Sequence, residues 1–480
     1  MKFCLRTADA VDPMRPRGTV DTVKTPASLL SFVLLASALL FTTAAEATAA
    51  SSSPSAASVA GSTSASPTSA ATNPAAVSGP ASTASAHDAF SLPETDVDLP
   101  GAGPIRRYDW FKNLWHSQRA GWAERVEKDQ NSIVFLGDSI TQFWGDVGSF
   151  FPGLKVSNRG ISGDTTRGVL IRLQDVFVLH PKAIVLLIGT NDLEEKAEPD
   201  TIAANLKLIL EAFRNRIPDT PVVLCSVFPS AESMHRPAAK IRKVNALYRD
   251  VVQDEPQVTM LDTWALFADV HDDAQSEYFP DLLHPNVRGY GQWAAALRPI
   301  FETLGLAPTW PDDFQPEAGF KSLFNGRDLT GWTYESDVNL DGKTDTTDRR
   351  YAVRNGRLVV TVSPLLRAYR TLWTTEKFPR DFVLKVEFRA SPNADSGIFV
   401  REPQLQCRDY LIAGPFTRLH HYRPLDWNEV VITVHGGLAH CTCNGEVIQD
   451  AMPIPATGPI GLESDHGQME YRRIRISETP

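Results

Sequence analysis

Four short segments of the sequence carry side chains that together could transfer an acyl group. They contain Ser139, Gly163, Asn191 and the pair Asp281 and His284, which stand three positions apart. These residue types supply a nucleophile, donors for an oxyanion, an orienting carboxylate and a base. Each segment alone is common by chance, since serine also caps helices and glycine and asparagine recur in turns. Their joint occurrence predicts the active site of a serine esterase.

The expected role of each residue follows from the chemistry of serine. A serine hydroxyl attacks an ester only when a base removes its proton, and His284 is the predicted base. Asp281 is predicted to hold the imidazole in the productive tautomer. The backbone N–H groups of Ser139 and Gly163 and the side-chain amide of Asn191 are predicted to form the oxyanion hole. This chemistry needs no cofactor, and none is expected.

The surrounding elements predict how these residues come together. Four apolar runs have the length of strands: 133–136, 183–188, 222–227 and 258–262. They alternate with segments of helical periodicity, which is typical of a parallel sheet covered by helices on both faces. Ligands bind at the carboxyl ends of such strands. Ser139 follows the first run and Asn191 follows the second, so both are expected at this edge.

Residues 131–304 resemble the SGNH (GDSL-type) hydrolase superfamily. The sequence blocks of that family appear here as GDSITQFW, NRGISGDTT, IGTND and DLLHPNVRGYGQW. The named positions of the family fall on Ser139, Gly163, Asn191 and His284, with Asp281 as the acid. The resemblance is greatest to platelet-activating-factor-acetylhydrolase-like and lysophospholipase-like members. It implies an α/β, flavodoxin-like fold with a parallel sheet, and ester hydrolysis through an acyl-serine.

The hydrophobic pattern changes beyond a Pro-rich linker at 307–318. Residues 382–389 alternate between apolar and polar side chains, which is typical of strands. Asn-Gly pairs begin at 325, 355 and 444 and are typical of hairpin turns. The chain from 319 to 480 is therefore predicted to be all-β, with a sandwich as the favoured architecture.

Residues 319–478 resemble the 3-keto-disaccharide hydrolase domain, which is related to laminin-G-like jelly rolls. The stretches FKSLFNGRDLTGW, FVLKVEFRASPNADSGIFVR and TGPIGLESDHGQMEYRRIRI carry the resemblance. It implies a jelly-roll sandwich that cleaves 3-keto-glycosides or only binds glycans. Candidates for sugar contact are Glu387, Arg401, Gln406 and Asp409, and Glu387 could act as an acid or base. Ordinary surface salt bridges are an equally good interpretation of these residues.

A segment in this domain imitates a calcium-binding loop. Its oxygen-bearing side chains stand at loop positions one, three, five, nine and twelve: Asp337, Asn339, Asp341, Asp345 and Asp348. Position twelve is Asp instead of the usual Glu, and no helices flank the loop. A solvated loop without metal is therefore the main expectation, and calcium is the alternative.

The N-terminus is typical of an exported protein. Basic residues precede an apolar stretch at 29–41, and Ala45-Glu46-Ala47 matches a signal cleavage site. The stretch is shorter than the roughly 18 residues that span a membrane, so a cleaved signal peptide at 1–47 is favoured over a membrane anchor. Residues 48–102 are predicted to be a disordered linker rich in Ser, Ala, Thr and Pro. The hydrolase domain is placed at 103–306.

Charge and cysteine content restrict the partners and the redox chemistry. The 480-residue chain has a formal net charge of −10, so neither nucleic acid nor an anionic membrane is an expected partner. Export would permit Cys407 to form a disulfide with Cys441 or Cys443, and unpaired thiols are the alternative. Cysteines and histidines lack the spacing of a zinc site.

These observations predict an exported serine esterase, periplasmic or extracellular, with two folded domains. Its substrate is expected to be a small-molecule or polysaccharide ester, most simply an acetylated carbohydrate, and the β domain is expected to bind or cleave glycosides. The pairing with a sugar-related domain is the basis of that choice. Two alternatives remain: a lysophospholipase or short-chain lipid esterase, and a glycan-binding protein or 3-keto-glycoside hydrolase in which the esterase is secondary.

Overall fold

The structure is a computed structural model, and it describes six stretches of the chain: 89–253, 255–307, 312–334, 338–361, 370–411 and 419–478. The predicted signal peptide and the linker up to residue 88 lie outside these stretches. No helix within them is both long and apolar enough to cross a membrane.

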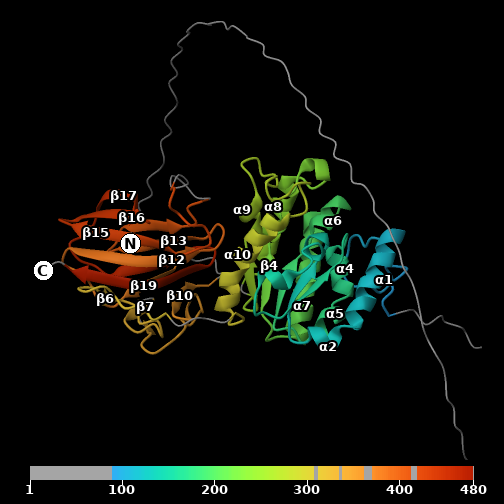
Figure 1. Ribbon diagram of the computed structural model, residues 1–480, viewed down its shortest axis with the longest axis horizontal. Coiled ribbons are helices and arrows are strands. Elements are labelled where there is room, and N and C mark those ends of the chain that lie inside the picture. Colours follow the sequence, from blue (N-terminus) through green and yellow to red (C-terminus); the bar gives the residue numbers. More distant parts are fainter. Residues whose placement is uncertain are drawn as a thin grey trace, which may run out of the picture. The chain divides into compact units, whose positions relative to one another are not determined.

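The first domain contains a five-stranded sheet in which every neighbouring pair is parallel (Figure 1). Its strand order is β2-β1-β3-β4-β5. The bounds are β1 Ile133–Gly137, β2 Val156–Gly160, β3 Ala183–Leu187, β4 Val222–Cys225 and β5 Val258–Leu261. The parallel sheet predicted from the continuously apolar runs is confirmed.

Helices cover both faces of this sheet. The helical segments are α1 Asp109–Ala123, α2 Val126–Asp129, α3 Ser139–Gln142, η1 Val147–Phe150, α4 Thr166–Ile171, α5 Gln174–Phe177, α6 Thr190–Glu194, α7 Pro199–Arg216, η2 Glu232–Met234, α8 Ala238–Val251, α9 Thr263–Phe267 and α10 Val287–Thr303. Because side chains alternate along a strand, Val134 and Leu136 join the core under α4, α7 and α8. Ile133 and Phe135 join the opposite core with α10. The domain therefore has three layers.

The predicted linker ends earlier in the chain than expected. Leu92 is buried and packs in a cluster with Phe111 and Trp115 of α1. Asp96 forms an ion pair with Arg167 at 2.6 Å. Residues 89–102 therefore belong to the packed hydrolase domain, because their apolar and charged side chains have partners there.

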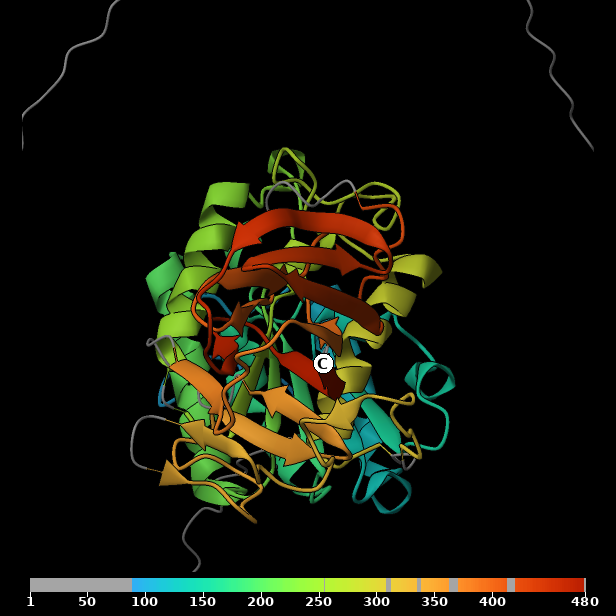
Figure 2. The ribbon, with the colours of Figure 1, turned by 90° about the vertical axis from the view of Figure 1, so that its left-hand side faces the viewer.

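The second domain is formed by two antiparallel sheets (Figure 2, orange to red strands). One has the order β17-β16-β15-β12-β19-β10-β9 with β6 on β19, and the other has the order β14-β13-β18-β11-β7-β8. The bounds are β6 Lys321–Ser322, β7 Trp332–Tyr334, β8 Val338–Asn339, β9 Tyr351–Arg354, β10 Arg357–Val360, β11 Arg370–Thr374, β12 Phe382–Ala390, β13 Asp395–Val400, β14 Gln404–Arg408, β15 Asn428–His435, β16 Leu438–Cys443, β17 Glu446–Pro453, β18 Ile460–Ser464 and β19 Met469–Glu478. The predicted sandwich is confirmed.

Local sequence explains much of this domain. Alternate residues of β12 are buried over its whole length, as the period-two pattern predicts. The Asn355-Gly356 and Asn444-Gly445 turns have positive φ at both residues and join β9 to β10 and β16 to β17. Asn325 lacks a positive φ, and its side chain instead accepts the N–H groups of Arg327 and Asp328. The third predicted hairpin is therefore a local turn.

The end of the Pro-rich linker is held against the second domain. Asp312 forms an ion pair with Arg473 of β19 at 3.0 Å. Glu317 pairs with Arg475 of β19 at 2.7 Å and with Lys385 of β12 at 3.1 Å. Hydrogen bonding from Arg475 lowers the pKa of Glu317 to about 2. Residues from 312 onward are thus part of the β domain, which starts before residue 319.

Candidate active site

The sheet places Ser139 at its carboxyl edge. Strand β1 ends at Gly137, and Ser139 begins the short helix α3. The Asp138 carboxylate accepts the N–H of Ile140 at 2.9 Å and so caps this helix. A Cβ at Gly137 would lie 2.3 Å from the carbonyl oxygen of Leu187, so only glycine allows β1 and β3 to approach here. The tight strand-to-helix turn leaves Ser139 buried, with 6% of its surface exposed.

Three predicted residues form one hydrogen-bonded line. His284 Nε2 lies 3.0 Å from Ser139 Oγ, and His284 Nδ1 lies 2.7 Å from Asp281 Oδ2. The other carboxylate oxygen of Asp281 accepts the backbone N–H groups of Leu283 and His284. Partial burial raises the pKa of Asp281, but these hydrogen bonds outweigh it and lower the pKa below its ordinary value. An ionised Asp281 keeps the proton on Nδ1 and leaves Nε2 able to accept the serine proton.

The loop that carries Gly163 is fastened to the segment that carries Ser139. The N–H of Ile161 donates to the carbonyl of Gly137 at 3.1 Å, and the N–H of Ser162 donates to the side chain of Gln142 at 2.6 Å. Gly163 has a φ of +84°, which disfavours other residues. These contacts hold its backbone beside helix α3, where an oxyanion hole is needed.

Two hydrogen bonds, one to each end of its amide group, hold the side chain of Asn191 in one orientation. Its Nδ2 donates to the carbonyl of Asp164 at 2.9 Å, and its Oδ1 accepts from Arg236 at 3.1 Å. Arginine has only donors, so the amide oxygen must face Arg236 and the nitrogen must face the loop that carries Gly163. The second N–H of this amide is then available to a ligand on that side.

Two arginines and one glutamate extend this arrangement. Arg236 also donates to Thr190 Oγ1 at 3.0 Å and pairs with Glu194 at 2.7 Å. Glu194 in turn pairs with Arg106, which lies before α1. Sequence reasoning missed Arg106, Glu194 and Arg236, because their distant segments meet only through tertiary packing and follow no local pattern.

Three buried carboxyl groups lie in the loops around the site. Burial raises the pKa of Asp138 to about 7, of Asp164 to about 6 and of Asp192 to about 7. Asp164 is paired with Arg172 at 2.7 Å, and Asp192 accepts both the N–H and the hydroxyl of Thr166. These groups fix the loops around the site.

The four candidate sugar contacts of the β domain do not form one site. Glu387 lies in the eight-stranded sheet and pairs with Arg472 and Arg473. Arg401 is buried and donates to the carbonyls of Pro455 and Arg380, and Asp409 is buried beside Tyr422. Gln406 lies in the other sheet. Period-two reasoning placed Glu387 and Gln406 at partly exposed strand positions, but it could not tell which sheet each strand joins. Arg401 and Asp409 lie just after strands β13 and β14 and are buried.

The six-stranded sheet has a polar face that includes Gln406. Gln404 and Arg408 of β14 lie on it with Gln406, and they contact Glu463 of β18 and Asp395 of β13. Asp395, Asp465 and His466 form the one cluster in the described ranges whose acidic and imidazole groups lie close enough to share an ion. The alternation within β13 and β14 was the available sequence signal for this face.

The calcium-like loop uses its carboxylates internally. Asp345 pairs with Arg354, and Asp348 accepts from the hydroxyl of Tyr334 at 2.6 Å and from Thr346 at 2.8 Å. Asp341 accepts the N–H of Gly331, and Asn339 that of Asp341 itself. Asp337 lies outside the described residues. The calcium alternative is therefore not supported, because the groups that would face an ion face protein donors. Elsewhere, Cys225, Cys407, Cys441 and Cys443 are buried free thiols.

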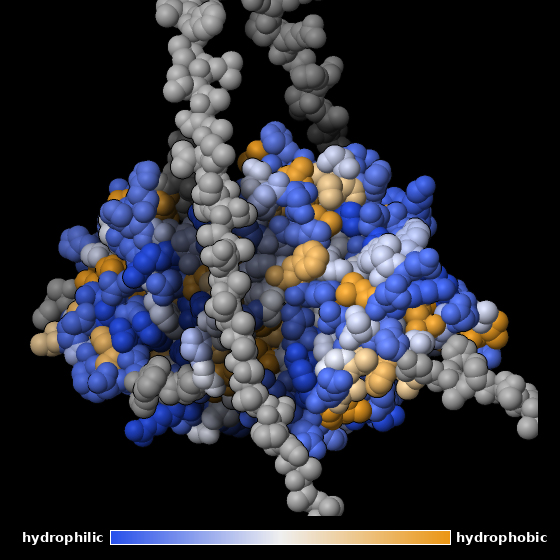
Figure 3. All heavy atoms as spheres, turned by 45° about the vertical axis from the view of Figure 1, so that its right-hand side comes forward, coloured by the Kyte–Doolittle hydropathy of each residue, from blue (hydrophilic) through white to orange (hydrophobic). Residues whose placement is uncertain are grey.

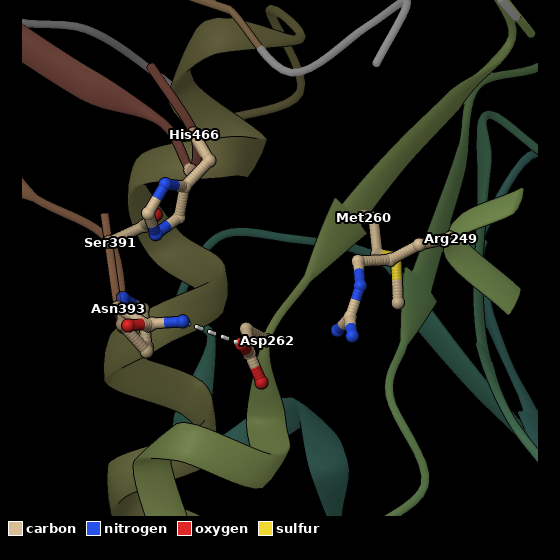
Figure 4. Close-up of a pocket in the computed structure, with 8 residues that line it drawn as sticks. Arg249, Met260, Asp262, Ser391, Asn393 and His466 are labelled. Carbon is tan, nitrogen blue, oxygen red and sulfur yellow. Dashed lines mark hydrogen bonds between the residues drawn. The ribbon is translucent and has the colours of Figure 1, made fainter. Parts of the chain in front are cut away.

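A separate cavity of about 370 Å³ is lined by residues of both domains. Asp262 follows β5, and its Oδ2 accepts from Asn393 Nδ2 at 3.1 Å (Figure 4). Arg249 and Met260 line one side and His466 lines the other (Figure 4). Its lining includes neither Ser139 nor His284, so it is distinct from the candidate active site.

The fold and this arrangement define a class: a three-layer α/β protein with a Ser-His-Asp centre at the carboxyl edge of its sheet. Residues 135–292 match the sequence model of the GDSL-like lipase/acylhydrolase family. Platelet-activating factor acetylhydrolase IB subunit alpha2 of Homo sapiens is 30% identical over 200 residues, which cover 40% of this chain and 83% of that protein. The chain belongs to the GDSL-like lipase/acylhydrolase family, and it is a carboxylic ester hydrolase.

A second family model and several solved structures are also similar to parts of the chain. Residues 319–477 match the model of the 3-keto-alpha-glucoside-1,2-lyase-like domain. A GDSL-like lipase from Bacteroides thetaiotaomicron is 26% identical, with a TM-score of 0.34, and covers 40% of this chain and 96% of its own. Axe2, an acetylxylan esterase from Geobacillus stearothermophilus, is 21% identical, with a TM-score of 0.30, and covers 36% of this chain and 94% of its own.

Proposed function

We propose that the chain is an exported serine esterase that removes acetyl groups from a decorated carbohydrate. The observation that carries the chemistry is the hydrogen-bonded line from Asp281 through His284 to Ser139. In this mechanism His284 takes the proton of Ser139 as Oγ attacks the ester carbonyl, and it later gives a proton to the leaving alcohol. The N–H groups of Ser139 and Gly163 and the amide of Asn191 stabilise the oxyanion.

Two observations support the choice of substrate. The human relative is named as an acetylhydrolase, which favours acetyl as the acyl half. The 3-keto-alpha-glucoside-1,2-lyase-like domain in the same chain favours a carbohydrate as the alcohol half. Export rests on the signal-like sequence at 1–47. A lipid ester is the rival substrate.

The test compares acetate release from acetylated xylooligosaccharides with hydrolysis of a lysophospholipid, using residues 48–480. Ser139→Ala should lower ester turnover by about 10⁴- to 10⁶-fold, and Ser149→Ala, an exposed serine ten positions later, should not. Retained turnover in Ser139→Ala would show that the nucleophile is elsewhere. Turnover of the lysophospholipid without release of acetate from the sugar ester would replace the carbohydrate by a lipid.

We also propose that the polar face of the six-stranded sheet binds the glycan or cleaves a 3-keto-glycoside. Burial raises the pKa of Glu463, as do the nearby Asp465 and Asp395 carboxylates. A carboxyl with a raised pKa keeps its proton to a higher pH, which makes Glu463 the candidate general acid of this face. Glu463→Gln should abolish any 3-keto-glycoside cleavage that survives in Ser139→Ala, whereas Glu387→Gln, on the other sheet, should not. If only Glu387→Gln affects this activity, the face has been assigned to the wrong sheet.

A further inference from the structure

Three aromatic side chains stand out on the surface of the described part of the chain. Tyr108, Trp110 and Phe143 are 54%, 51% and 56% exposed, more than any other Phe, Trp or Tyr side chain in that part of the chain. Exposed apolar surface is unfavourable in water, so a cluster of it commonly marks a binding site. The face shown in Figure 3 is largely hydrophilic, with hydrophobic residues in small groups.

Two of these side chains border the candidate active site, and Tyr108 is stacked on one of them, Trp110. A Cβ built on Gly163 would lie 2.7 Å from Trp110 Cη2. The edge of the indole therefore rests against the loop 161–164 that carries Gly163, which we call the oxyanion loop. The ring of Phe143 lies 5.1 Å from the imidazole of His284, measured between centroids. The aromatic residues therefore stand at two borders of the site, one beside the oxyanion loop and one beside the base.

Tyr108 and Trp110 form a pair of exposed, stacked rings, which we call the aromatic platform. Their rings are nearly parallel, with an interplanar angle of 9° and centroids 6.3 Å apart. Trp110 meets the buried ring of Phe111 edge to face at 5.7 Å. Phe111 belongs to the same core cluster as Ile161 of the oxyanion loop. The platform is thus anchored in the core and keeps a fixed position relative to Gly163.

The chemistry of the site indicates which half of the ester, acyl or alcohol, lies at each aromatic border. The leaving alcohol must lie beside His284 Nε2, because it receives its proton there. Phe143, which is in ring contact with His284, therefore borders the alcohol half. An alkyl chain gains most when it is enclosed on all sides, since the gain follows the apolar area removed from water. A sugar ring has an apolar C–H face and a hydroxyl rim that needs water, and an open platform suits it better.

We propose that the aromatic platform and Phe143 bind sugar rings of the alcohol half by stacking. The acetylated ring lies at Phe143 and His284, and a neighbouring sugar of the same chain lies on Tyr108 and Trp110. This inference rests on the proposed carbohydrate esterase function and adds residues that select the alcohol. The platform residues act on binding of the alcohol and have no part in the chemical step.

The experiment measures kcat and KM of the full chain without its signal on three esters. These are O-acetylated xylotriose, O-acetylated methyl xyloside and ethyl acetate, which carries no ring. Trp110→Ala and Tyr108→Ala should raise KM for the trisaccharide by about three- to tenfold, within the range of aromatic pair energies. The monosaccharide should respond less, and ethyl acetate should not respond. Phe143→Ala should raise KM for both sugar esters.

Two variants control for indirect effects. Trp110→Phe keeps an aromatic ring beside Tyr108 and should restore part of the trisaccharide KM. Val270→Ala alters a 93% exposed side chain and should match wild type on every ester. Thermal unfolding of each variant checks that the fold is retained.

Several outcomes would overturn the proposal. An equal kcat loss on ethyl acetate in Trp110→Ala and Tyr108→Ala would mean that the platform only supports the oxyanion loop. Ethyl octanoate, an ester with a long acyl chain, is assayed in addition. If the platform variants lost activity on this ester while KM for the sugar esters was unchanged, the platform would bind the acyl chain instead of the alcohol. If active variants showed an unchanged KM for all esters, the role of the platform would be refuted, and the proposed carbohydrate esterase function would be unaffected. A wild-type enzyme that hydrolyses ethyl acetate but neither sugar ester would overturn the carbohydrate function as well.

Discussion

Replacing Arg236 by methionine tests how the oxyanion amide is oriented. Arg236 is 2% exposed, and its guanidinium donates to Asn191 Oδ1 at 3.1 Å. Because arginine only donates, it disfavours the flipped amide, in which Nδ2 would face the guanidinium and Oδ1 would face the oxyanion. Arg236→Met removes that preference and leaves a side chain of similar length. Glu194 is partly exposed and keeps Arg106 as a charged partner.

The size of the effect follows from the hydrogen bond and from the oxyanion hole. A hydrogen bond with a charged partner contributes about 1.5–3 kcal/mol net, which corresponds to about a 10- to 150-fold change in rate. Complete loss of one oxyanion donor costs about 100- to 1000-fold in kcat. Arg236→Met should therefore lower kcat by about 10- to 100-fold, and Asn191→Ala by more. The KM for ethyl acetate should change by less than about threefold, since the amide binds charge that develops only in the transition state.

The assay is steady-state hydrolysis of ethyl acetate by wild type, Arg236→Met, Asn191→Ala and the double variant. If Arg236 acts through the amide, its replacement should add little to Asn191→Ala. Arg236→Lys retains a donor but not the planar fork, so its kcat should lie between those of wild type and Arg236→Met. Arg214→Met, in an exposed ion pair on α7, is the matched control. Losses that multiply in the double variant would refute the positioning role.

Three further predictions concern a buried acid, a glycine and a domain boundary. Burial raises the pKa of Asp138 from 3.8 to about 7, so between about pH 4 and 7 the folded chain keeps a proton that the unfolded chain releases, and this group's contribution to stability falls as pH rises. Asp138→Asn imitates the protonated acid and should flatten that decline in thermal unfolding scans. Gly163→Ala should lower kcat by about tenfold or more, because a Cβ would crowd Trp110 and disturb an oxyanion donor. The fragment 312–480 keeps the ion pairs of Asp312 and Glu317 and should therefore unfold at a temperature a few degrees higher than the fragment 319–480. Each kcal/mol of stability corresponds to about 2–4 °C in unfolding temperature.

Each of these predictions has a result that contradicts it. For Asp138→Asn it is a pH slope equal to that of wild type, since other carboxyl groups are common to both proteins and cancel in the comparison. For Gly163→Ala it is a kcat equal to that of wild type. For the fragments it is an equal unfolding temperature, which would mean that the ion pairs of Asp312 and Glu317 contribute nothing measurable.

The sequence indicated those candidate catalytic residues that stand next to a strand end. Ser139 and Asn191 directly follow apolar strands, and parallel strands bring their carboxyl ends to one edge whatever the loops do. Asp281 and His284 are three positions apart in one turn, so local geometry already brings them together. For these residues, strand order and the resemblance to a family were sufficient to predict a common site.

The predictions for the β domain were less complete for a physical reason. Alternation shows that a strand has two faces, but it does not show which sheet the strand joins. Glu387 and Gln406 both stand at polar positions of their strands, yet they belong to different sheets. Arg401 has a positive φ and turns inward to backbone carbonyls, which composition alone could not reveal.

The residues that refine the active site come from segments outside the sheet. Arg106, Tyr108 and Trp110 precede or begin α1, and Arg236 lies in a loop between η2 and α8. Their positions depend on how these segments dock on the oxyanion loop, so no spacing along the chain indicates them. Strand β1 positions Ser139, and the turn before α10 positions Asp281 and His284. The docked segments orient the Asn191 amide and carry the aromatic platform. Related esterases that share the same reacting groups can therefore differ in substrate through these docked segments alone.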